Sequence, residues 1–397
     1  MNDSSPRPTT TERPAEHTGA EPVEPRPAKV VIAPDSYKGT ASAQQAAQWL
    51  GEGVRSIIRD AQIVVAPMAD GGEGTSELFA GERITLPTTD AAGRLTEASY
   101  TFDAASATAY IDVAAASGLP AVKDNPVPLT GDTYGTGVLI ADAQTRGATR
   151  IVLGLGGSAT LDGGTGILVA LGANPIDAGG YQLKPGGGAL QNLADFDTAK
   201  VNIPAGSVDW VLLTDVDAPA TGERGAAATF GQQKGASGED IELLDAGLAQ
   251  LCSVAGLDPD TPGFGAAGGI AIGITWLSSL LHGDASHVAL APGARVVADA
   301  SGLTDAIQGA ALVITGEGRF DAQTGAGKVA SVVTELAREA GASVAVAAGS
   351  FESRPAEDVI AVELAATGGE IASTEDQLRR AGAEIAVAYL NTSTVQG

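Results

Sequence analysis

Short apolar runs alternate with amphipathic stretches along most of the chain, and the first two runs set the pattern. Residues 29–33 form a β-branched run typical of a buried strand, and residues 63–66 form a second. Between them, Ser42 followed three residues later by Gln45 predicts a capping box at the start of a helix. Apolar residues at helical spacing then continue to Ile58. This order predicts a βαβ unit with parallel strands.

The same alternation predicts further elements downstream. Strands are expected at 100–102, 109–113, 149–153, 211–214, 311–314, 343–347 and 358–362, the first two as a pair. Helices are expected at 133–146, 239–251 and 267–281. Three more are expected: one that ends at 171–172, one after 328, and one that begins at 373 or 374. Residues 173–207 are rich in glycine and proline and are expected to be irregular. Strands that alternate with helices favour an α/β fold.

The first 28 residues differ in composition from the rest of the chain. They are rich in proline, threonine, serine and glutamate, with Val23 the only bulky apolar residue after Met1. Such a segment cannot bury enough apolar surface to fold, so residues 1–28 are predicted to be a disordered tail. The remaining 369 residues favour two domains.

The net charge, the single cysteine and the longest apolar stretch limit the classes of function that the chain can have. The formal net charge of −25 argues against a nucleic-acid partner, because phosphates require a basic face. The single cysteine, Cys252, excludes a disulfide framework, and a cytoplasmic location is the default expectation. The longest apolar stretch, residues 268–281, contains threonine and serine and predicts a buried helix, so no membrane partner is expected.

Histidine is also scarce, which limits the acid–base and metal chemistry. His282 and His287 are five residues apart and lack an acid-rich metal-binding pattern around them. A general base is therefore expected to be a carboxylate. A bound metal is expected to be a hard, oxygen-liganded ion such as Mg²⁺.

A glycine-rich loop, Gly154 to Gly166, follows the predicted strand at 149–153. It interleaves six glycines with the hydroxyls of Ser158, Thr160 and Thr165 and with the carboxylate of Asp162. Backbone N–H groups, hydroxyls and one acid are the groups that hold a phosphate and its metal. A tight strand-to-helix turn is the alternative explanation.

Acidic and basic residues also follow several other predicted strands. In parallel α/β folds, ligands bind beyond the carboxyl ends of the strands. The residues in such positions are Asp35, Lys38, Asp70, Glu73, Asp162, Asp215, Asp217, Glu317 and Asp321. Five such loops on one chain favour a shared binding site over turns alone.

One motif points to a different cofactor. Gly154-x-Gly156-x-x-Ala159 matches the dinucleotide-binding fingerprint, and Asp177 lies at about the required distance beyond it. An NAD-dependent oxidoreductase is therefore an alternative function. However, the loop continues with another acid and two glycines, and Asp177 lies in the irregular stretch.

Nine segments, taken together and in order, resemble the glycerate kinase family, specifically the class that forms 2-phosphoglycerate. They are Val31-Ile-Ala-Pro-Asp-Ser-Tyr-Lys-Gly39, Pro67-Met-Ala-Asp-Gly-Gly-Glu-Gly-Thr75, Ala114-Ala-Ala-Ser-Gly118, Thr133-Tyr-Gly-Thr-Gly137, Gly156-Gly-Ser-Ala-Thr160, Asp215-Val-Asp217, Phe230-Gly-Gln-Gln-Lys-Gly235, Gly265-Ala-Ala-Gly-Gly269 and Thr315-Gly-Glu-Gly-Arg319. Leu161 and Ala218 depart from the family pattern, each standing where asparagine is usual. They are the basis of a third hypothesis, a homologue that binds a sugar acid without catalysis.

The resemblance implies two α/β domains, one inserted in the other. The first has a parallel sheet with flanking helices, and the active site lies in the cleft between the domains. The chain fits this arrangement, because the βαβ pattern of 29–84 reappears after about residue 300. The predicted outer domain is 29–84 plus 300–397, and the predicted inserted domain is 85–299.

The implied reaction is transfer of the γ-phosphoryl group of ATP to the 2-hydroxyl of D-glycerate, with Mg²⁺. Phosphoryl transfer mainly requires positioning and charge neutralisation. The expected cations are Lys38, Arg319, Lys328 and Lys234, and Asp162 and Asp215 are expected to bind Mg²⁺ or accept the hydroxyl proton. Asp70 and Glu73 are the next candidates for these two roles, and Glu317 is expected to bind the cofactor. The backbone of Gly156, Gly157, Ser158 and Thr160 is expected to hold phosphate or the glycerate carboxylate. The sequence does not determine the oligomeric state, and a homo-oligomer is one of the open alternatives.

Overall fold

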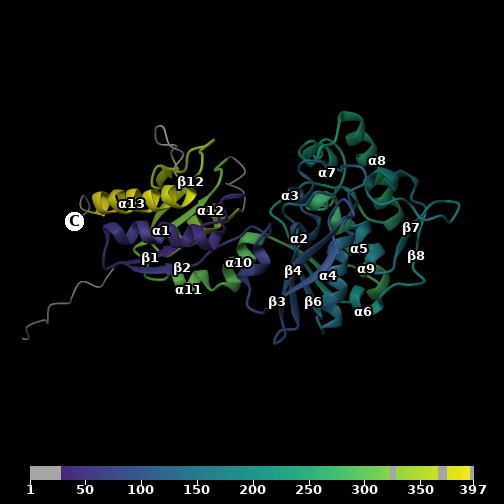
Figure 1. The fold of residues 1–397 in the computed structure, drawn as a ribbon, viewed down its shortest axis with the longest axis horizontal. Coiled ribbons are helices and arrows are strands. Elements are labelled where there is room, and N and C mark those ends of the chain that lie inside the picture. The colour runs from purple at the N-terminus through teal and green to yellow at the C-terminus, as the bar shows by residue number, and fades with distance from the viewer. Residues whose placement is uncertain (1–27, 322–327, 365–372, 394–397) are drawn as a thin grey trace, which may run out of the picture.

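The computed structural model describes residues 28–321, 328–364 and 373–393. Its strands form a five-stranded sheet, a six-stranded sheet and a two-stranded ribbon. Figure 1 places the first sheet and its helices on the left and the second sheet on the right, with α10 between them. The predicted α/β class, with parallel strands flanked by helices, is confirmed.

The first sheet is parallel throughout, in the order β13-β12-β11-β1-β2. Its strands are β1 (Lys29–Ile32), β2 (Gln62–Val65), β11 (Leu312–Glu317), β12 (Ser343–Ala348) and β13 (Ile360–Glu363). The pairing of β1 with β11 places residues 30–32 beside residues 312–314. All five carboxyl ends therefore meet at one edge of this sheet.

Helices cover both faces of the first sheet. α1 (Ala43–Ile57) and α13 (Thr374–Ser393) pack against one face, where Val30 and Ile32 contribute to the core. The helices on the other face, where Val31 contributes, are α10 (Gly293–Ala300), α11 (Leu303–Ile307) and α12 (Val329–Glu339). This alternation follows from the two-residue period of a strand. The predicted capping box at Ser42 and Gln45 is confirmed.

The second sheet is mixed, in the order β10-β9-β6-β5-β4-β3. Its strands are β3 (Glu82–Thr89), β4 (Leu95–Asp103), β5 (Thr108–Asp112), β6 (Arg150–Gly154), β9 (Asp209–Leu213) and β10 (Val288–Ala291). β5, β6, β9 and β10 are parallel, whereas β3, β4 and β5 form an antiparallel meander. The predicted pairing of 100–102 with 109–113 is confirmed, with Thr101 opposite Tyr110.

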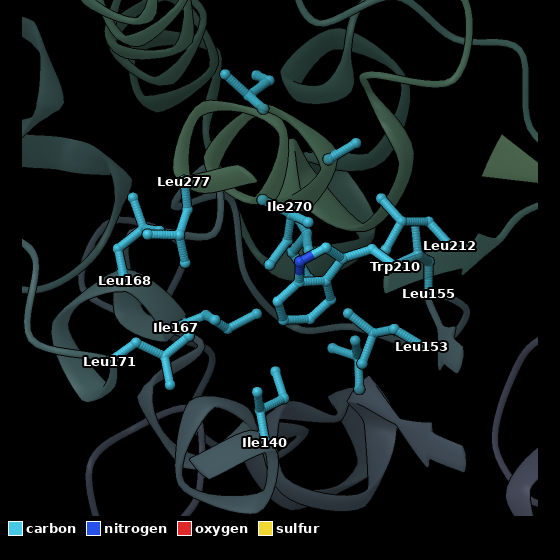
Figure 2. Packing of buried hydrophobic residues seen from close by; sticks show 14 of the residues in the cluster. Ile140, Leu153, Leu155, Ile167, Leu168, Leu171, Trp210, Leu212, Ile270 and Leu277 are labelled. Carbon is cyan, nitrogen blue, oxygen red and sulfur yellow. The ribbon is translucent and has the colours of Figure 1, made fainter. Parts of the chain in front are cut away.

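The second sheet has its own hydrophobic core. The longer helices around it are α4 (Tyr134–Thr145), α5 (Thr165–Ala170), α8 (Gly238–Ala255) and α9 (Ile270–His282). The shorter ones are α2 (Val113–Ser117), α3 (Leu119–Val122), α6 (Ile203–Gly206) and α7 (Ala226–Phe230). Trp210 of β9 is 1% exposed and lies at the centre of Figure 2, between Leu153 of β6 and Ile270 of α9.

None of the helices in the described residues is long and apolar enough to cross a membrane.

The segment 173–207 is more ordered than its composition predicts. β7 (Asn174–Ile176) and β8 (Asp195–Asp197) pair as an antiparallel ribbon, and α6 follows them. Elements of three or four residues are too short to leave a periodic pattern in the sequence. The expectation of an irregular segment is therefore wrong for these residues.

The chain completes the second sheet before it returns to the first. The limits of the two domains remain a proposal, and the packing favours limits slightly different from the predicted 84/85 and 299/300. β3 pairs in the second sheet from Glu82 onward. Ala294 and Val297 of α10 belong to the core of the first sheet. We therefore propose that the inserted domain runs from about residue 80 to Pro292.

Candidate active site

The loop that follows β2 joins the carboxyl edges of the two sheets. Gly156 donates its backbone N–H to the Gly71 carbonyl at 2.9 Å, so the loop after β2 is bonded to the loop after β6. A Cβ placed on Gly156 would lie 2.6 Å from the Gly72 Cα atom. Only glycine permits this approach of two backbones. The glycines at 71, 72 and 156 therefore bring the two edges together.

A buried carboxylate fixes the same loop from the second sheet. Asp112, at the end of β5, accepts hydrogen bonds from the backbone N–H groups of Gly74 and Ser76 and from the Ser76 hydroxyl, at 2.9–3.0 Å. Burial raises the pKa of Asp112 to about 6. The sequence analysis did not select Asp112, although it closes a predicted strand as the other acids do.

Three carboxylates from both sheets converge at this junction. Asp35 follows β1, Asp70 lies in the loop after β2, and Asp215 follows β9. Burial and, next, the negative charge of Asp70 raise the pKa of Asp35 to about 7. The same two causes, in the same order, raise the pKa of Asp215 to about 7. Asp70 therefore lies close enough to influence both, and the three acids form one cluster.

Asp215 presents an oxygen that is available for a ligand. Its Oδ1 accepts the backbone N–H of Gly293 at 2.9 Å, at the start of α10. Its Oδ2 is buried and has no hydrogen-bond partner among the described residues. Since a buried carboxylate oxygen without a partner is costly, this atom is a candidate ligand-binding group.

Two lysines lie near the acid cluster. Lys38 is exposed on the same loop as Asp35 and acts to lower the pKa of that carboxyl group. Lys328, the residue before α12, acts likewise on Asp215. Arg319 is exposed in the loop after β11 and forms a 3.1 Å ion pair with Glu352. Glu317, at the end of β11, is near enough to raise the pKa of Asp35.

The environment of Asp162 differs from that of this cluster. Asp162 is fully buried, and its Oδ2 accepts the backbone N–H and the hydroxyl of Thr133 and the backbone N–H of Gly166. Its Oδ1 accepts the backbone N–H of Gly164 at 3.2 Å. These bonds tie the start of α4 to the start of α5. They favour a positioning role for Asp162, and its predicted role as a metal ligand stays a prediction.

A buried lysine forms hydrogen bonds to the predicted phosphate loop at 156–160. Lys234 is 4% exposed, and its Nζ donates to the Ser158 Oγ at 2.9 Å and to the Thr160 carbonyl at 2.7 Å. Burial lowers the pKa of Lys234 to about 7. Ser158 and Thr160 are also buried, and the Gly156 N–H is bonded to Gly71. Gly157 has a positive φ of 76°.

The residues at the junction fit a magnesium ion that arrives with phosphate groups. The donors are carboxylate oxygens, which Mg²⁺ prefers, and the Oδ2 of Asp215 lacks a partner in the described chain. Within the described ranges, no group of three or more His, Cys, Asp and Glu residues could hold a metal ion. Mg²⁺ in phosphoryl-transfer sites commonly uses only one or two carboxylates plus substrate phosphates. Asp215 and Asp70 match that arrangement.

The dinucleotide hypothesis does not have the structural context that it requires. The fingerprint must lead from a strand directly into a helix. Here β6 ends at Gly154, but α5 begins only at Thr165. Asp177 accepts the backbone N–H groups of Gly179 and Tyr181 in a local turn, so it is engaged away from the loop. The match is therefore coincidental.

The fold and the site define an α/β protein whose candidate functional residues come from the facing edges of two sheets. The family model described as "Glycerate kinase family" matches residues 30–394. The Escherichia coli K12 protein named glycerate 2-kinase is 41% identical over 335 residues, covering 81% of this chain and 85% of that protein. The chain belongs to the glycerate kinase family.

Two other comparisons agree with this assignment. The glycerate kinase of Halalkalibacterium halodurans is 39% identical over 332 residues, which cover 81% of this chain and 85% of the relative. A crystal structure described as "putative glycerate kinase 2 from Salmonella typhimurium LT2" superimposes with a TM-score of 0.74 at 35% identity. That match covers 93% of this chain and 98% of the other.

Proposed function

We propose that the protein is an ATP-dependent glycerate 2-kinase, which converts D-glycerate and ATP to 2-phosphoglycerate and ADP. The observation that carries this proposal is the junction cluster of Asp35, Asp70 and Asp215, flanked by Lys38 and Lys328. Such a site supplies the three needs of phosphoryl transfer, namely cations, metal-binding carboxylates and a proton acceptor. The relative named glycerate 2-kinase supports the choice of the 2-hydroxyl.

In the proposed reaction, the 2-hydroxyl oxygen of glycerate forms a bond to the γ-phosphorus as the bond from that phosphorus to ADP breaks. Asp35 accepts the hydroxyl proton, because a carboxylate with a pKa of about 7 is well matched to neutral pH. Burial is the largest cause of that shift and does not depend on the charge of Asp70. Bound Mg²⁺, held by Asp215 and Asp70, would neutralise phosphate charge.

The cations have separate tasks in this proposal. Lys38 pairs with the glycerate carboxylate, since it lies on the same loop as Asp35. Lys328 and Arg319 bind the phosphates of ATP, and Lys328 also has the start of α12 behind it. Lys234 does not contact substrate, because its Nζ is buried and donates to Ser158 and Thr160. It keeps the loop at 156–160 in place.

The alternative of a non-catalytic homologue loses one of its two supports. Leu161 is fully buried within the core of the second sheet, so its side chain lies with the apolar residues there and not at the junction. Ala218, close to Asp215 in the chain, remains as the other support. We also propose a cytoplasmic location, on the ground that Cys252 is single and free.

The deciding experiment offers ATP, Mg²⁺ and D-glycerate to the purified protein, with enolase as the coupling enzyme. Enolase consumes 2-phosphoglycerate and not the 3-isomer, so a positive signal reports both turnover and the position of transfer. We expect a signal that chelation of Mg²⁺ removes. ADP release with another hydroxy acid but none with glycerate would overturn the proposed substrate, and no ADP release with any acid would favour the non-catalytic alternative.

A further inference from the structure

The connection between β12 and β13 lacks the helix that usually joins parallel neighbours. The two strands are parallel, and residues 349–359 link them without any helical turn. α12 precedes β12 and lies over the sheet beside this link. A crossover helix would ordinarily fill the space next to α12. Its absence leaves a groove along that helix.

The groove has a mainly apolar lining and the size of a small-molecule site. Its volume is 390 Å³, within the range of roughly 300–1,000 Å³ that ligand pockets occupy. Its apolar walls are Phe320, Ala330, Val346, Pro355, Ala356 and Val359. Polar residues of α12, among them Ser331, Thr334 and Glu335, form its rim. An apolar slot with a polar rim suits a flat heterocycle that carries hydroxyl groups.

Two backbone bonds fix Phe320, one of the residues that line the groove. The Phe320 N–H donates to the Ser350 carbonyl at 2.9 Å, and the Glu352 N–H donates to the Phe320 carbonyl at 2.8 Å. The rings of Phe320 and Phe351 lie 5.5 Å apart between their centroids. These contacts hold the aromatic ring of Phe320 in the lining of the groove.

Two residues of the groove lining are close in the chain to the proposed phosphate-binding cations. Phe320 follows Arg319 directly, and Ala330 lies two residues beyond Lys328. The Ser331 hydroxyl donates to the Lys328 carbonyl at 2.8 Å, which joins the rim of the groove to Lys328. Lys328 in turn is near enough to Asp215 for its positive charge to act to lower the pKa of that carboxyl group. These contacts connect the groove, through Lys328, to the acid cluster.

We propose that this groove binds the adenosine part of ATP, with the triphosphate extending past Arg319 and Lys328 toward Asp215. This inference rests on the proposed kinase function and specifies where its nucleotide lies. The base packs against the apolar walls near Phe320, and the ribose hydroxyls face the polar rim on α12. The start of α12, a helix of 11 residues, favours the negative phosphates.

A second cavity in the structure does not compete for this role. Its volume is 220 Å³, and it is lined by residues of the inserted domain, among them Val169 and Lys184. Neither Arg319 nor Lys328 lines it. It offers a matched control, because a large side chain there fills a cavity without touching the groove.

The test fills each cavity with a tryptophan in the full-length protein. Thr334→Trp and Ala356→Trp fill the groove, and Val169→Trp fills the second cavity. Calorimetric titration with ADP measures nucleotide binding without any need for turnover, and circular dichroism checks the fold of each variant. We expect both groove variants to weaken ADP binding and to raise the KM for ATP by about tenfold or more, which is about 1.4 kcal/mol. The KM for D-glycerate should stay within about twofold, and Val169→Trp should bind ADP as the wild type does.

The outcomes separate the inference from the function on which it rests. Wild-type turnover together with unchanged ADP affinity in both folded groove variants would overturn the groove as the nucleoside site. Wild-type protein that binds ADP but does not phosphorylate glycerate would overturn the proposed function. Weakened ADP binding in the groove variants would support the groove in either case.

Discussion

Asp215 unites a structural and a chemical role in its two oxygen atoms. One oxygen accepts the Gly293 N–H, and the other is buried without a partner in the described chain. We expect Asp215→Asn to lower kcat by about 100-fold or more, because an amide is a poor Mg²⁺ ligand. The fold should survive, since the asparagine carbonyl can still accept from Gly293. The enolase-coupled assay and a thermal melt measure the two effects.

The neighbouring Asp217 is a matched control for this change. It follows the same strand but is exposed, and no hydrogen bond to its side chain is found among the described residues. Asp217→Asn should leave kcat within about twofold, as exposed substitutions away from a site usually do. Equal losses in both variants would contradict the role assigned to Asp215.

Asp162 gives a prediction about stability. Its two oxygens accept four hydrogen bonds in a fully buried position, three of them at Oδ2. Asp162→Asn replaces one acceptor with a donor and should cost roughly 2–4 kcal/mol of unfolding free energy, measured by urea titration. The folded fraction should keep most of its kcat if Asp162 only positions the helices. A folded variant without activity would instead support the predicted metal role.

Lys234 makes stability depend on pH in a defined window. Its pKa falls from 10.5 in the unfolded chain to about 7 in the folded protein, because it is buried. Between these values the unfolded chain binds one more proton than the folded protein, so the unfolding free energy rises with pH. Below pH 7 both forms are protonated and the slope vanishes. The unfolding free energy of the wild type, relative to that of Lys234→Met, should therefore rise from pH 7 to pH 10 by on the order of 3 kcal/mol.

Lys123→Met is the control, because Lys123 is exposed. The unfolding free energy of Lys123→Met should change with pH by the same amount as that of the wild type between pH 7 and pH 10. A Lys234→Met curve parallel to wild type would show that Lys234 is not buried as described.

At the level of elements, three glycines determine how the loops of the two sheets meet. A Cβ on Gly156 would lie 2.6 Å from the Gly72 Cα atom, and backbone cannot move aside as a flexible side chain can. Gly156→Ala should cost roughly 1–3 kcal/mol of stability and raise the KM for both substrates. Gly238→Ala, with nothing within 4 Å of its Cβ, should change neither quantity appreciably. Thermal melts and initial rates test both variants.

The elements that the sequence predicted well are those with a long periodic pattern. The helix after Ser42, the helix at 239–251 and the strand at 343–347 are found within a few residues of their predicted limits. β3 was not predicted, and it carries Pro87, which an edge strand tolerates because its N–H side can face away from the sheet. β10 was also missed, since four residues beside a proline leave too little pattern.

The candidate site was predictable in part. Lys38, Asp70 and Asp215 follow predicted strands, and Lys328 precedes a predicted helix. The structure brings the loops of these residues together. The chemical distinction between Asp35, Asp215 and Asp162 depends on tertiary packing. Burial and the charge of Asp70 raise the first two pKa values, and four donors from two helix ends bind the third carboxylate. No local sequence pattern records such contacts.

On the scale of the whole molecule, the two sheets possess separate cores. The cluster around Trp210 contains residues from the second sheet and its helices, whereas the clusters around Val31 and Val30 belong to the first. Separate cores favour separate unfolding transitions. We expect differential scanning calorimetry of the full chain to resolve two transitions. ADP should raise the midpoint of the one that belongs to the first sheet, because that sheet carries the groove along α12.

Fragment-specific hydrogen exchange assigns each transition to its sheet. A single cooperative transition, with equal protection of both sheets up to the midpoint, would contradict independent cores.

The pairing of β1 with β11 also affects how the protein is made. The Thr315 hydroxyl bonds to the Ala33 carbonyl across 282 residues of chain. A ribosome adds about 5–20 residues per second, so β1 waits roughly 15–60 s for its partner while the inserted strands are synthesised and can fold. During that time one side of β1 is an open edge of the kind that invites mispairing. The order of synthesis therefore makes the first sheet, although it begins the chain, the last part of the protein to be completed.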